Sequence, residues 1–181
     1  KKYVSDGGYT LLDKIKNKEI DKEKVLLELE NSNLRGLGGA GFPAGKKWRI
    51  LKEQSSPRLL AVNIDEGEPG TFKDRYYLES NPHRFFEGML IATEVVGVDK
   101  IYIYLRDEYA AARKIMSQEI KELQKKYTDS IPDIELRRGA GAYICGEESA
   151  MIESIEGKKG MPRLRPPFVA QVGLFDRPTL S

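Results

Sequence analysis

The feature that most constrains the fold is a nearly continuous apolar run, Arg58-Leu-Leu-Ala-Val-Asn-Ile64. Such a run is typical of a strand that is buried on both faces of a parallel sheet. A helical stripe follows, which begins at Asn81-Pro82 and stops at Gly97, and a second run of β type covers residues 99–105. Strand, helix and strand in this order predict an α/β layer fold.

The rest of the chain continues this alternation of helices and strands. Helical spacing of apolar residues is found at 9–16, 21–30, 43–53, 108–127 and 143–156, and the alternating segment 132–137 predicts an edge strand. We therefore predict a Rossmann-like, mainly parallel sheet that is flanked by helices. At 181 residues the chain is long enough for one domain with a sizeable core. We place a helical lead-in at residues 1–32 and a ligand-binding domain at residues 33–181.

Composition excludes several classes of protein. Lys and Arg number 30 against 28 Asp and Glu, and a net charge of only +2 argues against a dedicated nucleic-acid binder. No apolar run approaches the roughly 18 residues of a membrane span. Cys145 is the only cysteine, which excludes an internal disulfide and an all-cysteine metal cluster and favours a cytoplasmic setting. The chain starts without methionine and stops just after Arg-Pro-Thr-Leu, so we expect a fragment of a longer protein.

A glycine-rich stretch from Asn33 to Trp48 is the strongest functional signal. Five glycines lie between Gly36 and Gly45, and Lys46 and Lys47 follow. Bare backbone N–H groups beside positive charge suit a phosphate, and the stretch leads into a helix N-terminus. Gly36, Gly38 and Gly41 match G-x-G-x-x-G, but a helix and not a strand precedes them, so the ordinary Rossmann context is absent. The alternative is a tight connection.

Acidic residues follow the first apolar run and open the last helical segment. Asp65, Glu66 and Glu68 could hold a divalent metal, accept hydrogen bonds from sugar hydroxyls, or form a solvated acidic turn. Glu147 and Glu148 could complement a helix dipole or act as general acid and base.

Three further residues admit two interpretations each. Cys145 could be a nucleophile near a helix N-terminus, paired with the only histidine, His83, or it could simply pack in the core. His83 would otherwise be a structural residue of a first helical turn. Phe42, between glycines, could stack on a planar ring or belong to the core.

Three long motifs in one order carry a resemblance. They are Leu34–Trp48, Val62–Arg75 and Gly139–Glu148, and Pro162-Arg-Leu-Arg-Pro-Pro-Phe168 fits as well. Together they resemble the NADH- and FMN-binding flavoprotein subunit of respiratory complex I and its counterparts in NAD-dependent formate dehydrogenases and NAD-reducing hydrogenases. The segments 75–90 and 146–157 look more like the formate dehydrogenase branch.

The resemblance implies a role for each site residue. FMN would be bound by Gly36, Gly38, Gly39, Lys47, Asn63, Asp65, Glu66, Tyr143, Gly146, Glu147 and Glu148. NADH would be bound by Phe42, Lys47, Glu68, Glu148, Arg165 and Phe168. No metal ligand and no catalytic side chain beyond the cofactor is implied, and the charge of Glu148 would tune the flavin. Leu37 and Arg165 depart from the family, which commonly has Arg and Lys at these positions.

The resemblance also implies an activity and a setting. The chain would be an oxidoreductase module, a diaphorase that transfers a hydride between NAD(H) and FMN. Its partners would be a thioredoxin-like [2Fe-2S] subunit and other electron-transfer subunits, and it would meet a membrane only through its complex, on the cytoplasmic side. The ubiquitin-like domain and the [4Fe-4S] motif of the family are not in these residues. Two alternatives remain, a non-catalytic assembly fragment and a metal-dependent phosphohydrolase that uses Asp65, Glu66 and Glu68.

Overall fold

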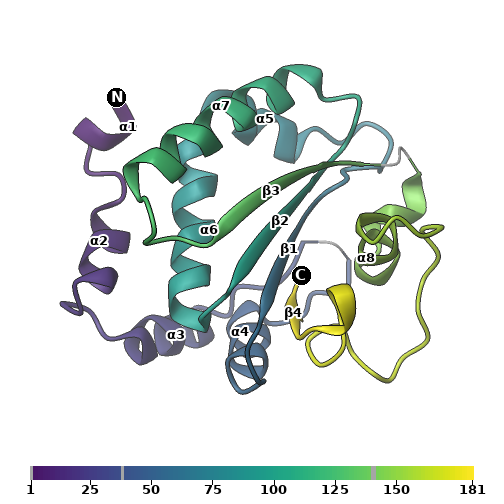
Figure 1. Ribbon diagram of the computed structural model, residues 1–181, viewed down its shortest axis with the longest axis horizontal. Helices are drawn as coiled ribbons and strands as arrows, with labels where there is room; N and C mark the ends of the chain where they lie inside the picture. The colour runs from purple at the N-terminus through teal and green to yellow at the C-terminus, as the bar shows by residue number, and fades with distance from the viewer. Residues whose placement is uncertain (1, 38, 140–141) are drawn as a thin grey trace.

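A four-stranded parallel sheet forms the centre of the described molecule. The computed structural model describes residues 2–37, 39–139 and 142–181. The strands are β1 (Leu59–Ile64), β2 (Lys100–Leu105), β3 (Asp133–Arg138) and β4 (Thr179–Leu180), in the order β3-β2-β1-β4 (Figure 1). The predicted α/β fold and parallel sheet are confirmed. The short strand β4 was not predicted.

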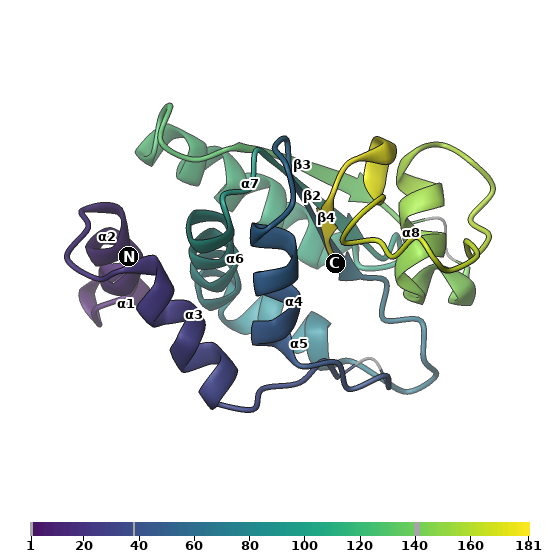
Figure 2. The ribbon, with the colours of Figure 1, turned by 90° about the horizontal axis from the view of Figure 1, so that it is seen from below.

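Helices cover both faces of this sheet, with α6 and α7 on one side and α8 on the other (Figure 2). The α-helices are α1 (Lys2–Ser5), α2 (Thr10–Lys16), α3 (Lys22–Asn31), α4 (Ala44–Lys52), α5 (Lys73–Ser80), α6 (Pro82–Val96), α7 (Ala110–Lys126) and α8 (Glu148–Ile155), and the 3₁₀ helices are η1 (Tyr143–Gly146) and η2 (Leu174–Asp176). No helix in the described ranges is both long and apolar enough to cross a bilayer.

The two faces of the sheet bury two separate cores. On β2, Ile101 and Ile103 pack with α6 and α7, whereas Tyr102 and Tyr104 pack with α8. This division follows from the period of two along a strand. The apolar run of β1 divides in the same way, which confirms that the strand is buried on both faces.

Several helix ends fall where the sequence predicts them. The Asp21 side chain caps α3 by accepting a hydrogen bond from the N–H of Glu23 at 3.1 Å. Gly97 follows α6 with φ 78°, and Gly157 follows α8 with φ 77°, as expected for glycines that end helices in the left-handed conformation.

His83 and Cys145 lie on opposite sides of the sheet. His83 joins α6 to the lead-in and to α7, because its Nδ1 lies 3.0 Å from the Tyr9 hydroxyl and its Nε2 lies 3.4 Å from Glu119 Oε2 in α7. Cys145 is buried in the core beneath α8. These two residues therefore do not form a Cys–His pair. Cys145 packs in the core, and His83 is a structural residue of the first turn of α6.

Candidate functional site

The glycine stretch forms a closed loop in front of α4. Its ends are held together by the N–H of Gly36, which donates to the Phe42 carbonyl at 3.0 Å, and by the N–H of Ala44, which donates to the Leu34 carbonyl at 2.9 Å. Between them, Gly39 and Gly41 have φ values of 95° and 60°, and no atom lies within 4 Å of where their Cβ atoms would be. The tip of the loop is therefore open backbone that a ligand can approach.

The loop also contains Leu37, Gly38 and Phe42, each of which carries an expectation from the sequence. Gly38 lies outside the described residues, so its predicted role in binding FMN stays a prediction. Leu37, where the resemblance implied an arginine, is 81 % exposed. Phe42 is also exposed, which is against the interpretation that it belongs to the core.

Lys47 connects the glycine loop to two distant parts of the chain. Its Nζ donates to Glu148 Oε2 at 3.2 Å and to the Ser181 carbonyl at 2.7 Å. The same Nζ lies 6.0 Å from the centre of the Phe42 ring. The structure thus brings together Lys47, Phe42 and Glu148, all three of which were predicted as site residues.

Asn63 and Asp65 lie at the carboxyl end of β1, where ligands of open α/β sheets are bound. Asn63 shares a strand face with Leu59 and Ala61 and donates from Nδ2 to the Gly146 carbonyl at 2.8 Å. Its Oδ1 accepts a hydrogen bond from the Asp65 N–H at 3.1 Å. Asn63 therefore joins the end of β1 to the turn before α8.

Asp65 is a buried carboxyl group, with an exposed fraction of 2 %. Within the described ranges no group donates a hydrogen bond to its carboxylate, and burial raises its pKa, opposed in part by Arg106. A Cβ on Gly67 would lie 2.9 Å from Asp65 Oδ2, and one on Gly146 would lie 3.7 Å from it. A buried acceptor that lacks a donor and lies between glycines fits a ligand hydroxyl.

Replacing Asp65 with asparagine is expected to stabilise the ligand-free protein at neutral pH. The pKa of Asp65 is higher in the folded protein than in the unfolded chain, so the folded state holds more protons between the two values. The free energy of unfolding therefore falls as the pH rises through this window. The gain of Asp65→Asn should shrink as the pH approaches about 3.9, the ordinary pKa of aspartate.

Urea unfolding of both proteins at pH 7 and at acid pH measures this difference, with the exposed Asp6→Asn as control. A gain of equal size at both pH values would contradict the assignment.

Glu66 uses its carboxylate within the protein. It accepts hydrogen bonds from the N–H groups of Asp74 and Arg75, at 2.6 and 3.1 Å, and from the Tyr109 hydroxyl at 2.7 Å. Burial acts to raise the pKa of Glu66, but these hydrogen bonds outweigh it and the pKa is lowered. Glu66 thus caps α5, a helix that was not predicted, and its contact with FMN stays a prediction.

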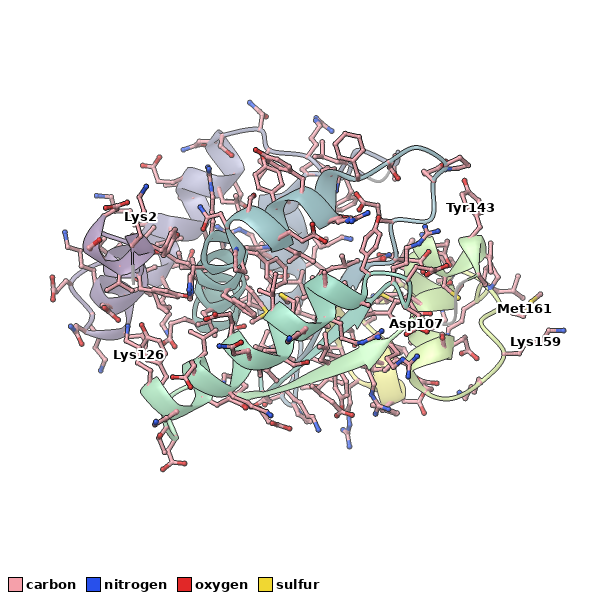
Figure 3. All side chains as sticks on the ribbon, turned by 90° about the horizontal axis from the view of Figure 1, so that it is seen from above. Lys2, Asp107, Lys126, Tyr143, Lys159 and Met161 are labelled. Atoms are coloured by element: carbon pink, nitrogen blue, oxygen red, sulfur yellow. The ribbon has the colours of Figure 1, made fainter. Side chains whose placement is uncertain are left out.

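Glu68 lies on the same loop and pairs with Tyr143, whose hydroxyl donates to Glu68 Oε1 at 2.6 Å. This hydrogen bond raises the pKa of Tyr143, which projects from the end of the molecule that carries α8 (Figure 3). Asp65, Glu66 and Glu68 therefore have separate environments. In the part of the chain that the structure describes, no group of three acidic, histidine or cysteine side chains could hold a metal ion. Nothing in the described site supports the phosphohydrolase alternative.

The predicted helix over 143–156 is wrong at its start. Residues Tyr143–Gly146 form η1, and α8 begins only at Glu148, because Glu147 turns the chain and caps it. Glu147 Oε2 accepts hydrogen bonds from the N–H groups of Ser149 and Ala150 at 3.0 and 2.9 Å. Burial acts to raise the pKa of Glu147, but these hydrogen bonds and Arg165 lower it, so the carboxylate is charged.

Arg165 brings the last predicted segment to this site. Its Nη2 contacts Glu147 Oε1 and lies 2.9 Å from Glu148 Oε1. Glu148 is thus held between two cations, Lys47 and Arg165. Phe168, three residues further on, is exposed, as an aromatic ring that stacks on a ligand would have to be.

Sequence reasoning missed three residues that shape the site. Tyr109 and Arg106 hold Glu66, the first through its side chain and the second through a hydrogen bond to its carbonyl at 2.5 Å. Ser149 holds Glu147, because its Oγ donates to Glu147 Oε2 at 2.5 Å. No local pattern identifies them, since each acts on a residue that the fold brings to it.

Comparison with known proteins gives one consistent result. Residues 29–179 match the model of the Nuo51 FMN-binding domain. A subunit of the NADH-quinone oxidoreductase of Aquifex aeolicus is 47 % identical over 98 % of this chain and 43 % of the relative. The mitochondrial NADH dehydrogenase [ubiquinone] flavoprotein 1 of Dictyostelium discoideum is 47 % identical over 88 % of this chain and 36 % of the relative. The chain thus spans less than half the length of these relatives.

Solved structures agree with the sequence relatives. A chain of an NAD⁺-reducing [NiFe]-hydrogenase in the H₂-reduced state matches with a TM-score of 0.84 and 42 % identity, over 92 % of this chain and 29 % of that chain. The match to the air-oxidized state has a TM-score of 0.81 and 44 % identity, over 88 % of this chain and 28 % of that chain. The resemblance seen in the glycine loop and the acidic motifs is confirmed, and the chain belongs to the Nuo51 FMN-binding domain family.

Proposed function

We propose that this chain supplies the FMN- and NADH-binding surface of an NADH-oxidising flavoprotein within a multi-subunit electron-transfer complex. The observation that carries the proposal is that Lys47, which follows the open glycine loop, reaches Glu148, while Asn63 and Asp65 at the carboxyl end of β1 lie beside Gly146, two residues before Glu148. A phosphate and a hydroxyl-bearing chain are the groups that these residues fit. When bound, FMN accepts a hydride from NADH and passes the electrons on.

The protein has to bind and orient the two nucleotides. The N–H groups of the loop that holds Gly36, Gly38 and Gly39, together with Lys47, would hold the FMN phosphate. Asn63 and Asp65 would bind the ribityl hydroxyls, with Glu66 beside them. The η1 turn, with Tyr143 and Gly146, and the carboxylates of Glu147 and Glu148 would border the ring of the flavin.

NADH would lie across the same opening. The exposed rings of Phe42 and Phe168 would stack on its planar groups, Glu68 would accept from a ribose hydroxyl, and Arg165 would contact its polar end. The negative charge of Glu148 would disfavour an anionic reduced flavin and thereby tune its potential. Lys47 is close enough to Phe42 and Glu148 to act on both nucleotides.

The relatives support a proposal for the partners and the location. The names of the relatives describe parts of NADH-quinone oxidoreductases, and the solved structures are of an NAD⁺-reducing hydrogenase. We propose a thioredoxin-like [2Fe-2S] subunit as the electron-accepting neighbour, with a [4Fe-4S] cluster in the rest of the protein. A peripheral place at the cytoplasmic side of a membrane complex is the corresponding location. The formate dehydrogenase branch stays a prediction.

The visible spectrum of the purified protein tests the proposal. FMN should bind and give flavin bands, and NADH added without air should bleach them. A protein that stays colourless after incubation with FMN would instead favour the assembly-fragment alternative. The variant Gly39→Val should bind FMN far more weakly. Gly39 has a φ of 95°, and a β-branched residue strains the loop in this conformation.

A further inference from the structure

We propose that Arg163 is a positioning residue for NADH, which it serves by fixing the loop of residues 158–173 that carries Arg165 and Phe168. The proposal rests on the function proposed above for those two residues. The family resemblance gives Arg163 itself no role in binding FMN or NADH. It acts through the loop and does not touch the reacting atoms.

The guanidinium of Arg163 ties the loop to α8 and to its own far end. Its Nε donates to Glu153 Oε1 at 2.5 Å and its Nη2 donates to Glu156 Oε2 at 2.9 Å. Its Nη1 donates to the Gly173 carbonyl at 2.9 Å. Glu153 and Glu156 are three residues apart in sequence, at the end of α8, and therefore share a face. One side chain thus fixes the loop at two places.

These contacts are shielded from solvent, unlike ordinary surface ion pairs. The exposed fractions of the side chains are 23 % for Arg163, 17 % for Glu153 and 5 % for Glu156. Glu156 also accepts a hydrogen bond from the N–H of Phe175 at 2.7 Å, which adds η2 to the same cluster. Partly buried, charge-assisted hydrogen bonds of this kind are stronger than exposed pairs.

The main chain of Arg163 reaches the site directly. Its N–H donates to Ser149 Oγ at 2.9 Å, and Ser149 Oγ donates to Glu147 Oε2 at 2.5 Å. Glu147 is the carboxylate that Arg165 contacts from two residues further along the loop. Ser149 is buried, so this line of hydrogen bonds sets how far the loop stands from Glu147.

Besides Arg163, the loop is held by Lys158, which pairs with Glu156 at 2.6 Å, and by the buried Val169, whose carbonyl accepts from the Thr179 N–H at 3.1 Å. None of its residues, 158–173, belongs to a helix or strand, and Leu164 between the two arginines is 91 % exposed. The three hydrogen bonds leave the planar guanidinium of Arg163 in different directions, which its fixed fork of donors allows. An ammonium group concentrates its charge at one point and cannot reach all three acceptors. Lysine should therefore not replace Arg163.

The test compares Arg163→Lys with Lys159→Gln in the intact flavoprotein. Lys159 lies on the same loop but points away from the body of the molecule (Figure 3). We expect Arg163→Lys to raise the KM for NADH about tenfold, because Arg165 and Phe168 would no longer be held where NADH binds. FMN content and kcat should stay within about twofold of the unchanged protein, because the glycine loop, Lys47 and Asn63, which would hold FMN, lie outside this loop. Lys159→Gln should change none of these values.

Trypsin cleavage after Lys159 supplies a readout that does not depend on activity. We expect cleavage in Arg163→Lys to be about fivefold faster or more, because the loop opens more often. Unchanged cleavage would show that Arg163 does not hold the loop, and faster cleavage with an unchanged KM would show that the loop does not position NADH. Either result overturns the proposal.

A milder variant covers the case in which Arg163→Lys fails to fold. Glu153→Gln removes the charge of one of the two carboxylate acceptors and should give the same two changes, each smaller. If the unchanged protein does not oxidise NADH, the proposed function fails. The positioning role is then decided by NAD⁺ affinity together with the cleavage rate, and a weaker affinity in Arg163→Lys is the expected result.

Discussion

Replacing Lys47 with alanine is expected to raise the Kd for FMN by about 10- to 100-fold. Lys47 is the cation next to the open glycine loop, and a hydrogen bond to a charged group is worth about 1.5–3 kcal/mol. Its present partners, Glu148 and the Ser181 carbonyl, show that the ammonium group already points toward the site. Loss of Lys47 also leaves the Glu148 carboxylate with Arg165 as its remaining cation in the described chain. The less neutralised carboxylate then repels a phosphate more strongly.

Lys46 provides the matched control for this experiment. It is the neighbouring lysine in the same helix turn and is exposed, and its side chain makes no ion pair or hydrogen bond within the described chain. Titration of FMN fluorescence into both variants measures the Kd, and the difference should shrink at high salt because the interaction is electrostatic. An equal effect of Lys46→Ala and Lys47→Ala would refute a specific phosphate contact.

Replacing Gly45 with alanine is expected to lower the free energy of unfolding by about 1–3 kcal/mol, the usual cost of overpacking. A Cβ on Gly45 would lie 2.7 Å from the Glu30 nitrogen and 2.8 Å from its Cα. Both are main-chain atoms, so α3 and α4 would have to move apart. Since α4 carries Lys47 two residues further on, FMN affinity should fall as well.

Gly88 supplies the opposite case within the same protein. It is an exposed glycine inside α6, and nothing lies within 4 Å of its Cβ position. Gly88→Ala should therefore raise the free energy of unfolding by about 0.5–1 kcal/mol, because alanine has the higher helix propensity. Urea unfolding of both variants measures the two effects. If both substitutions shift the free energy of unfolding in the same direction, the result would contradict a close contact between α3 and α4 at Gly45.

Some functional residues can be predicted from the local sequence pattern, and others cannot. The glycine loop and Lys47 form one continuous stretch, and their anion-binding character can be inferred without a structure. The role of Glu66 could not be inferred from the sequence, because its carboxylate caps a helix that starts seven residues later. For the same reason α5 was missed, since its first residues carry no capping side chain of their own.

The sequence by itself determined the alternation of strands and helices, the helix ends at Asp21, Gly97 and Gly157, and the family. Periodicity and capping depend on neighbouring residues, so they can be recognised in a short window. The tertiary structure alone decided that β4 joins β1, that Asp65 is buried without a donor in the described chain, and that Lys47 meets Glu148. Burial and pairing depend on segments far apart in the chain, and Lys47 and Glu148 are 101 positions apart.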